Sequence, residues 1–246
     1  MESAVRPAAP SDHARLIEVA AEGDFNDCES GYLSFIADVG RLLCSTTDGE
    51  PVAFGGMVPV GDVAMVTDLF VADAARGRGI GGRLLAVLLD GRPRRMTFSA
   101  QHPAALAAYR REGMEPRGRV LYLSGSALGG GTPVTPGAWL HRRDELVDYF
   151  ALHGATVTAN AVFTDDGSGS GIEVLRLDAP NAIEECDRLL RAFEAGTAVK
   201  MSVPEQKPLA TWLIAHGFVV TDHDVMCATE GVDLPPTLAA LHPGLA

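Results

Sequence analysis

The run Asp68-Leu-Phe-Val-Ala-Asp-Ala-Ala-Arg-Gly-Arg-Gly-Ile-Gly-Gly-Arg-Leu-Leu85 joins an apolar strand, a glycine-rich loop and the start of an apolar helix that continues to about Asp90. The first N–H groups of a helix have no partner inside it, and the positive end of the helix dipole lies there. The glycines leave no side chain to hold an anion away from those groups, and two arginines add positive charge. The run therefore predicts a phosphate-binding loop, formed by Arg76, Gly77, Arg78, Gly79, Ile80, Gly81 and Gly82.

Two other phosphate-binding loops match this run less well. The glycines satisfy the dinucleotide pattern G-x-G-x-x-G, so a nucleotide-dependent oxidoreductase is an alternative. In that fold the turn follows its strand directly, and an acidic residue lies about 20 positions further on. Here the strand ends near Val71, well before the first glycine, and no such acid follows. Arg83-Leu84 stands where a P-loop requires Lys and then Ser or Thr.

The surrounding pattern predicts a mixed α/β sheet in the first half of the chain. The expected strands cover residues 5–7, 42–46, 51–59, 64–71, 95–100 and 120–123. Helices are expected from Ser11, as N-cap, to Ala20, then from Phe25 towards Gly40, and over 104–111 before Gly113. Asp48-Gly49 predicts a hairpin turn.

A run poor in core-forming side chains divides the chain. Residues 124–136 are rich in Gly, Ser and Thr and contain two Pro, which indicates a linker. We therefore expect a first domain over 1–123, a linker over 124–136, a smaller second domain over 137–230 and a C-terminal tail over 231–246. In the second domain we expect helices at 140–152, 182–195 and 208–216, a polar hairpin tip at 165–171, and strands at 156–164, 171–177, 198–203 and 218–228.

Both halves end with the same order of elements. Met96-Thr-Phe-Ser is followed by a helix and Gly113-Met114, and Val199-Lys-Met-Ser by a helix and Gly217-Phe218. This rhythm predicts a degenerate internal duplication, with chance similarity between two common strand–helix–strand units as the alternative.

The residues around the loop resemble the GNAT N-acetyltransferase superfamily. Arg76, Gly79 and Gly81 match the family signature (Q/R)-x-x-G-x-(G/A), in a long context of strand and helix. The later run from His102 to Met114 resembles a second family motif, in which Ala105, Tyr109 and Gly113 match while His102 replaces Asn, Ala108 a larger hydrophobic residue and Met114 Phe. The similarity covers roughly residues 4–123.

This resemblance implies a GNAT acyltransferase fold, followed by a second, smaller GNAT-like domain. It implies an N-acetyltransferase that uses acetyl-CoA and releases coenzyme A. The cofactor would contact the backbone of Leu69, Phe70 and Val71, the loop Arg76–Gly82, and His102 and Ala105. A backbone N–H near Phe70 or Val71 would stabilise the oxyanion, and Tyr109 would protonate the leaving thiolate.

Carboxylates are the candidates for binding or deprotonating the amine. Asp68 is the only charged residue between Val63 and Val71, so it is a candidate base or amine anchor, with a structural hydrogen-bonding role as the alternative. A water chain without a dedicated base is also open. A further acidic group on the early helices indicates either a solvated face or a cation-binding site: Glu22, Asp24, Asp27 and Glu29.

The second domain lacks this equipment. Asp178–Glu185 contains no Gly, and Glu184 and Glu185 would repel a phosphate. Leu213 falls where Tyr109 would align. We therefore expect a degenerate domain that no longer binds the cofactor, and that either walls the substrate cleft or forms a dimer interface.

Composition limits the partners. The net charge of −12 argues against nucleic acid and favours a cationic acceptor, such as a small-molecule or peptide amine. The sequence shows no apolar run long enough for a membrane span and no signal-like start, which predicts a cytoplasmic protein without membrane contact. The four cysteines lack zinc-like spacing, so we expect reduced thiols and no metal. A homodimer and a non-catalytic acyl-CoA-binding or sensory role stay open.

Overall fold

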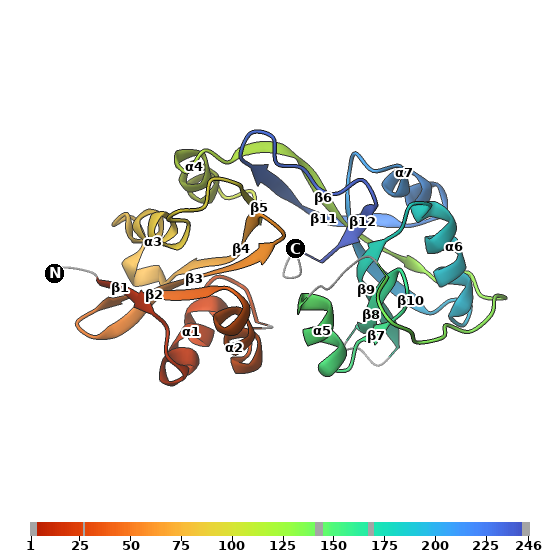
Figure 1. The fold of residues 1–246 in the computed structure, drawn as a ribbon, viewed down its shortest axis with the longest axis horizontal. Helices are drawn as coiled ribbons and strands as arrows, with labels where there is room; N and C mark the ends of the chain where they lie inside the picture. The colour runs from red at the N-terminus through yellow and green to blue at the C-terminus, as the bar shows by residue number, and fades with distance from the viewer. Residues whose placement is uncertain (1–3, 27, 141–144, 167–169, 243–246) are drawn as a thin grey trace. The chain divides into compact units, whose positions relative to one another are not determined.

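The computed structural model describes residues 4–26, 28–140, 145–166 and 170–242, and the chain divides into two compact units (Figure 1). Unit 1 contains the residues up to Pro116 together with the later segment Cys227–Val232. Unit 2 contains Arg117–Met226 and the residues from Asp233 onward. Each unit is a mixed α/β sheet with helices, which confirms the expected fold class.

In unit 1, a sheet carries the chain from its N-terminus to the glycine-rich loop. The strands follow the order β1 (Ala4–Pro7), β2 (Arg41–Thr47), β3 (Glu50–Val60), β4 (Val63–Val71) and β5 (Arg95–Ser99). Neighbours are antiparallel as far as β4, and β4 and β5 are parallel. The helices are α1 (His13–Ala21), α2 (Ser30–Val39), α3 (Ile80–Leu88) and α4 (Pro103–Arg111), with short 3-10 turns at Pro10–Asp12 and Asp73–Ala75.

Two successive glycines of β3 show how the helices of unit 1 are divided between the faces of the sheet. A Cβ on Gly55 would lie 3.2 Å from Leu88 of α3, whereas a Cβ on Gly56 would lie 3.2 Å from Ile36 of α2. Because successive strand positions point to opposite faces, α2 covers one face and α3 the other. α1 packs beside α2, and α4 packs beside α3 (Figure 1).

The expected elements of the first half are confirmed, with shifts at some ends. The hairpin turn is present, because Asp48 and Gly49 both have positive φ, 53° and 91°. The first helix does not begin at Ser11: a 3-10 turn covers that residue, and Asp12 is the N-cap of α1. The carboxylate of Asp12 pairs with Arg6 at 2.7 Å and accepts the Ala9 N–H at 2.7 Å, which fixes this start.

Unit 2 has its own set of strands and its own core. Its strand order is β11 (Val219–Ala228), β6 (Glu115–Ser126), β10 (Ala198–Pro204), β9 (Gly171–Asp178), β8 (Ala161–Asp165) and β7 (Thr156–Val157), and β12 (Leu238–Leu241) also pairs with β9. The helices are α5 (Glu145–Leu152), α6 (Ala182–Ala192) and α7 (Pro208–Ala215). Leu189, Leu190 and Leu213 from these helices are fully buried in the core.

The division of the chain differs from the one expected from composition. The expected linker over 124–136 begins inside β6, and the expected tail over 231–246 contains β12. Residues 117–123, expected in the first domain, belong to unit 2. Of the expected helix at 140–152, residues 141–144 lie outside the described residues, as do residues 167–169 of the expected hairpin tip.

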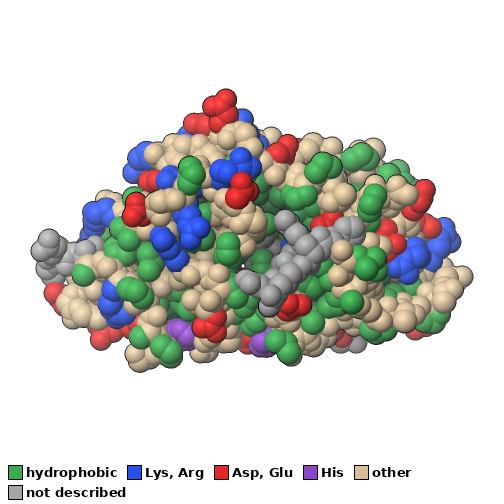
Figure 2. All heavy atoms as spheres, in the orientation of Figure 1, with side chains coloured by type: hydrophobic (Ala, Val, Ile, Leu, Met, Phe, Trp, Pro, Cys, Tyr) green, Lys and Arg blue, Asp and Glu red, His purple; other side chains and the backbone are tan. Residues whose placement is uncertain are grey.

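Four further features bear on function. The four cysteines are buried free thiols. No helix of the described residues is long and apolar enough to cross a membrane. Among the same residues, no three His, Cys, Asp or Glu side chains are grouped as metal ligands. Charged side chains of both signs are interspersed over the face shown in Figure 2.

Candidate functional site

Strand β4 continues beyond the residues that pair with β5. Its last part therefore has an open backbone edge. The parallel pairing covers three residues and ends with Val66 opposite Thr97, whose hydroxyl donates to the Val66 carbonyl at 3.0 Å. The antiparallel ladder with β3 skips Thr67, which is therefore a β-bulge. β4 then continues to Val71, and no described strand lies beside this last part on the β5 side.

The open edge exposes the backbone of alternate residues. The Ala72 N–H donates to the Val52 carbonyl at 2.9 Å, so residue 72 is hydrogen-bonded towards β3. Because hydrogen-bonded and non-bonded pairs alternate in an antiparallel ladder, Leu69 and Val71 direct their N–H and C=O groups towards the open edge. The Val71 carbonyl accepts Arg76 Nε at 3.1 Å, as this orientation requires.

Phe70 differs from its two neighbours. Its backbone pairs with Phe54 of β3, so its N–H does not face the open edge. Its ring stacks between those of Phe25 and Phe54, at centroid distances of 5.7 and 5.4 Å. Of the three residues expected to contact the cofactor through backbone groups, Leu69 and Val71 have the geometry for it, and Phe70 supports the strand through its side chain.

The glycine-rich loop leads from this edge into α3. Gly77 and Gly79 have φ of 77° and 72°, a region that residues with a Cβ rarely adopt. Gly79 is the N-cap of α3, and Ile80 anchors the first turn in the core. The backbone N–H groups of the first turn therefore stand at the end of an apolar helix with no side chain of Gly81 or Gly82 over them.

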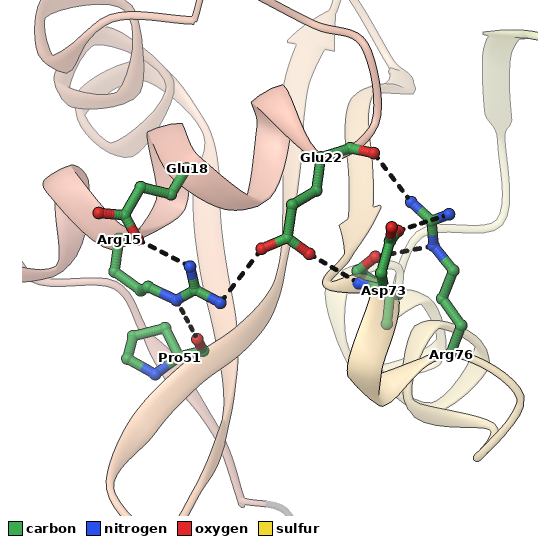
Figure 3. Close-up of polar contacts among 7 residues, drawn as sticks. Arg15, Glu18, Glu22, Pro51, Asp73 and Arg76 are labelled. Carbon is green, nitrogen blue, oxygen red and sulfur yellow. Dashed lines mark hydrogen bonds and ion pairs between the residues drawn. The ribbon is translucent and has the colours of Figure 1, made fainter.

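A hydrogen-bond network fixes the loop to the end of α1 (Figure 3). One carboxylate oxygen of Glu22 accepts the Asp73 N–H at 2.7 Å, and the other pairs with Arg15 at 3.4 Å. Arg76 pairs with Asp73 at 2.7 Å and donates to the Glu22 carbonyl at 3.4 Å. The guanidinium of Arg76 therefore holds the loop in shape, while the loop's other charges remain exposed.

Three exposed arginines surround the start of α3. Arg78 and Arg83 lie in the loop and on the helix, and Arg83 Nη1 donates to the Arg78 carbonyl at 3.2 Å. Arg111, at the end of α4, places its Nη1 3.5 Å from where a Cβ on Gly82 would stand. Figure 2 shows basic side chains recurring over the region where Figure 1 draws α3 and α4. The sequence reasoning did not identify Arg111.

Asp68 lies on the other face of the sheet, towards α2. Its carboxylate is 4% exposed and accepts the Tyr32 hydroxyl at 3.0 Å. Burial raises the pKa of Asp68 to about 6, and the hydrogen bond from Tyr32 opposes this rise. Burial and the nearby Asp68 charge also raise the pKa of the Cys28 thiol to about 12. Tyr32 gave no signal in the sequence, because its partner is 36 positions away.

Tyr109 and the other α4 residues lie on the α3 side. Tyr109 is the one buried residue of α4, with 5% of its surface exposed. His102 is the N-cap of α4, where its Nδ1 accepts the Ala104 N–H at 3.2 Å, and Ala105 follows in the first turn. The sheet thus separates Asp68 from Tyr109, with the open edge of β4 at the boundary between the two faces.

Glu22, Asp24 and Glu29, expected on the early helices, instead lie between α1 and α2 and do not form one cluster of equivalent groups. Glu22 takes part in the loop network, whereas Asp24 and Glu29 are exposed. Asp27 lies outside the described residues. The expectation of a solvated acidic face therefore applies to Asp24 and Glu29, and Glu22 has a defined structural partner.

Comparison with known proteins finds a family for the first half of the chain. Residues 35–115 match the model of the acetyltransferase (GNAT) domain. A search of curated proteins finds no match. The matched span contains the open edge, the loop and α4.

Solved structures share the fold over nearly the whole chain. A Pyrococcus horikoshii protein assigned as an acetyltransferase has a TM-score of 0.71 at 15% identity, covering 99% of this chain and 95% of its own. A GCN5-related N-acetyltransferase from Kribbella flavida has a TM-score of 0.56 at 17% identity, covering 92% and 71%. One from Sphaerobacter thermophilus has a TM-score of 0.53 at 14% identity, covering 94% and 98%. Residues 35–115 therefore match the GNAT acetyltransferase domain, and the chain shares its fold with these solved structures.

Proposed function

We propose that unit 1 transfers the acetyl group of acetyl-CoA to a primary amine of a small molecule or peptide. The observation that supports this most directly is the continuity of the open β4 edge with the glycine-rich loop. One feature offers backbone hydrogen bonds to an extended, amide-containing chain, and the other offers N–H groups to a pyrophosphate. Acetyl-CoA combines such a chain and such a pyrophosphate in one molecule.

The residues present fit this substrate. Leu69 and Val71 would bind the pantetheine arm along the edge of β4, and the N–H groups at Gly81 and Gly82 would bind the pyrophosphate. Arg78, Arg83 and Arg111 surround that position with positive charge, while Arg76 holds the loop. Acetyl-CoA supplies an activated acyl group, and the protein supplies position and charge stabilisation.

Acyl transfer needs a neutral amine, a stabilised oxyanion and a proton for the leaving thiolate. We assign oxyanion stabilisation to the N–H of Leu69 or Val71, which face the open edge. We assign the proton to Tyr109, because a phenol of pKa about 10 matches the basicity of a thiolate. Asp68, next to Leu69 but on the opposite face, would attract the amine and accept its proton through water.

The two alternative functions, an oxidoreductase and a non-catalytic acyl-CoA-binding protein, require different features of the site. The family match covers the loop, so the G-x-G-x-x-G coincidence is not needed to explain it, and the oxidoreductase alternative loses its basis. A non-catalytic acyl-CoA-binding protein would need the edge and the loop but not Tyr109. The phenol therefore separates catalysis from binding alone.

The test is the variant Tyr109→Phe, which keeps the ring and removes the hydroxyl. Acetyl-CoA affinity, measured by calorimetry, should stay within about twofold, while turnover by thiol release should fall by about 100-fold. Tyr122→Phe is the matched control: that hydroxyl donates to Asp224 in unit 2, and its loss should leave turnover unchanged. Unchanged turnover in Tyr109→Phe would disprove the assigned role. A wild-type protein that binds acetyl-CoA but acetylates no amine would favour the sensory alternative.

A further inference from the structure

Unit 2 repeats the strand arrangement of the unit 1 site. Strands β9 and β10 are parallel over four residues, and the pairing ends with Val174 opposite Met201. The ladder between β9 and β8 skips Leu175, directly after this last pair. In unit 1, the last parallel pair involves Val66 and the skipped residue is Thr67. In both units, therefore, the parallel pairing ends one residue before the β-bulge. Arg176 of unit 2 occupies the position that Asp68 occupies in unit 1.

The helix that follows also corresponds between the two units. The Met114 N–H donates to the Tyr109 carbonyl at 3.0 Å, and the Phe218 N–H donates to the Leu213 carbonyl at 3.0 Å. Leu213 therefore stands where unit 1 has Tyr109, as the sequence alignment of the two halves predicts. These matches support the internal duplication, and they identify the part of unit 2 that corresponds to the cofactor edge.

In unit 2 this edge is already occupied by the chain's own strand β12. The His242 N–H donates to the Leu175 carbonyl at 2.8 Å, Ala240 pairs with Leu177, and the Ala179 N–H donates to the Thr237 carbonyl at 2.9 Å. Positions 175, 177 and 179 of unit 2 correspond to 67, 69 and 71 of unit 1. The backbone groups that unit 1 leaves for an extended ligand are thus saturated in unit 2.

Strand β12 is firmly held in this position. Its four residues, Leu238 to Leu241, are each 2% exposed or less, and it packs against β10 as well as β9. Lys207 Nζ donates to the carbonyls of Pro235 and Pro236 at 2.9 and 3.2 Å, just before the strand begins. These contacts show that β12 is a buried strand of the sheet.

The loop between β9 and α6 of unit 2 also lacks the features of the glycine-rich loop of unit 1. Residues 72–79 separate β4 from α3, whereas only 179–181 separate β9 from α6. Glu184 and Glu185 lie in the first turn of α6, where a phosphate would meet negative charge. Unit 2 therefore lacks a pyrophosphate cradle beside its occupied edge.

We propose that β12 is an internal substitute for the pantetheine arm, which fills the acyl-CoA edge of unit 2 and keeps that unit free of cofactor. The inference rests on the function proposed for unit 1. It predicts that the chain binds a single acetyl-CoA, in unit 1, and that unit 2 serves as a structural domain whose former ligand groove is sealed by the C-terminal segment.

Two measurements on the full chain test this. Calorimetry should show a single acetyl-CoA per wild-type chain and none for Gly81→Glu, which blocks the unit 1 loop. Hydrogen exchange read by mass spectrometry should show slow amides at 175–179 and 238–242 without ligand. Acetyl-CoA should leave these amides unchanged and slow exchange at 69–82.

The outcomes separate this inference from the proposed function. Two acetyl-CoA molecules per wild-type chain, or faster exchange at 238–242 on adding acetyl-CoA, would each overturn the role of β12. Fast exchange at Ala240 and His242 without ligand would overturn it independently of any binding. A wild-type chain that binds no acetyl-CoA, with slow amides at 238–242, would instead refute the function of unit 1.

Discussion

At the scale of single residues, Asp68 combines burial with ionisation. Its pKa in the folded chain is raised to about 6, mainly by burial, whereas an unfolded Asp titrates near 3.9. The folded state therefore binds the proton more tightly, so the stability that the protonated group contributes is complete below pH 4. It is lost as the pH rises through about 6.

Asp68→Asn should remove this pH dependence, because the amide oxygen can still accept the Tyr32 hydroxyl. At pH 8 the variant should have a free energy of unfolding higher than wild type by about 3 kcal/mol, and the difference should vanish near pH 4. Urea unfolding followed by circular dichroism measures it. Tyr32→Phe should enlarge the loss and extend it above pH 6, because the hydroxyl opposes the rise of the pKa and its removal raises the pKa of Asp68 further. A difference independent of pH would contradict this explanation.

Glu22 is predicted to position the cofactor loop rather than to bind substrate. Its carboxylate accepts the Asp73 N–H at 2.7 Å, so Glu22→Ala should loosen the start of the loop. The KM for acetyl-CoA should rise by about 3- to 10-fold with little change in kcat, as expected for one hydrogen bond to a charged group. Glu18→Ala is the control, because Glu18 also pairs with Arg15 but does not contact the loop. Equal effects of the two substitutions would show that only Arg15 matters.

The sequence predicts which residues form the loop, but not which of them stabilise the loop and which face the ligand. Gly77 and Gly79 lie in the predicted loop, and they have positive φ, which the phosphate-binding pattern did not specify. Arg76 matches the family signature, yet its guanidinium is committed to protein groups, which depends on where α1 ends in space. Tyr32 and Arg111 reach the site from distant helices. Such contacts follow from packing, which a local pattern does not encode.

At the scale of elements, the glycine-rich loop and the first turn of α3 form one continuous segment. Its proposed role in binding acetyl-CoA depends on small residues. A Cβ on Gly81 would stand 3.2 Å from Val71, at the junction of the open edge and the helix. Gly81→Glu should therefore place bulk and negative charge where the pyrophosphate would bind. We expect acetyl-CoA binding to fall below detection in calorimetry, while circular dichroism stays that of wild type. Gly137→Glu is the control, since no atom lies within 4 Å of its Cβ position, its φ is not positive and it belongs to unit 2. Normal binding by folded Gly81→Glu would mean that the loop is misassigned.

The elements themselves were largely predictable, because apolar periodicity and turn residues are local signals. Every strand expected in the first half is present, and so are the four helices. The end of β6 was misjudged, because Ser124 and Gly125 read as linker residues but pair with Lys200 and Val199 of β10. β12 was missed as well. Its short run, Leu238–Leu241, gains strand structure only by docking on β9.

At the scale of the whole molecule, the order of residues does not coincide with the order of units. Unit 1 contains Cys227–Val232, more than a hundred positions beyond its other residues. A domain boundary predicted from composition divides the chain at one place. It therefore cannot assign a late segment to an early unit. The consequence is that unit 1, which carries the proposed active site, depends on a segment near the C-terminus for its completion.

Thr229 is the point at which this dependence can be tested. Its N–H donates to the Arg95 carbonyl at 3.0 Å, and its Oγ1 accepts the Arg95 N–H at 3.0 Å. Thr229→Pro removes the backbone donor and should lower the stability of unit 1 by about 1–3 kcal/mol. Thr229→Val keeps that donor and loses only the hydroxyl, so its effect should be smaller.

The chain offers an internal reference for this measurement. Both of its tryptophans, Trp139 and Trp212, belong to unit 2, so their fluorescence follows that unit while acetyl-CoA binding follows unit 1. If Cys227–Val232 completes unit 1, Thr229→Pro should lose acetyl-CoA affinity at a temperature where the tryptophan signal is still native. A variant in which tryptophan fluorescence changes first, with acetyl-CoA binding intact, would assign the segment to unit 2 and leave unit 1 complete within its first 116 residues.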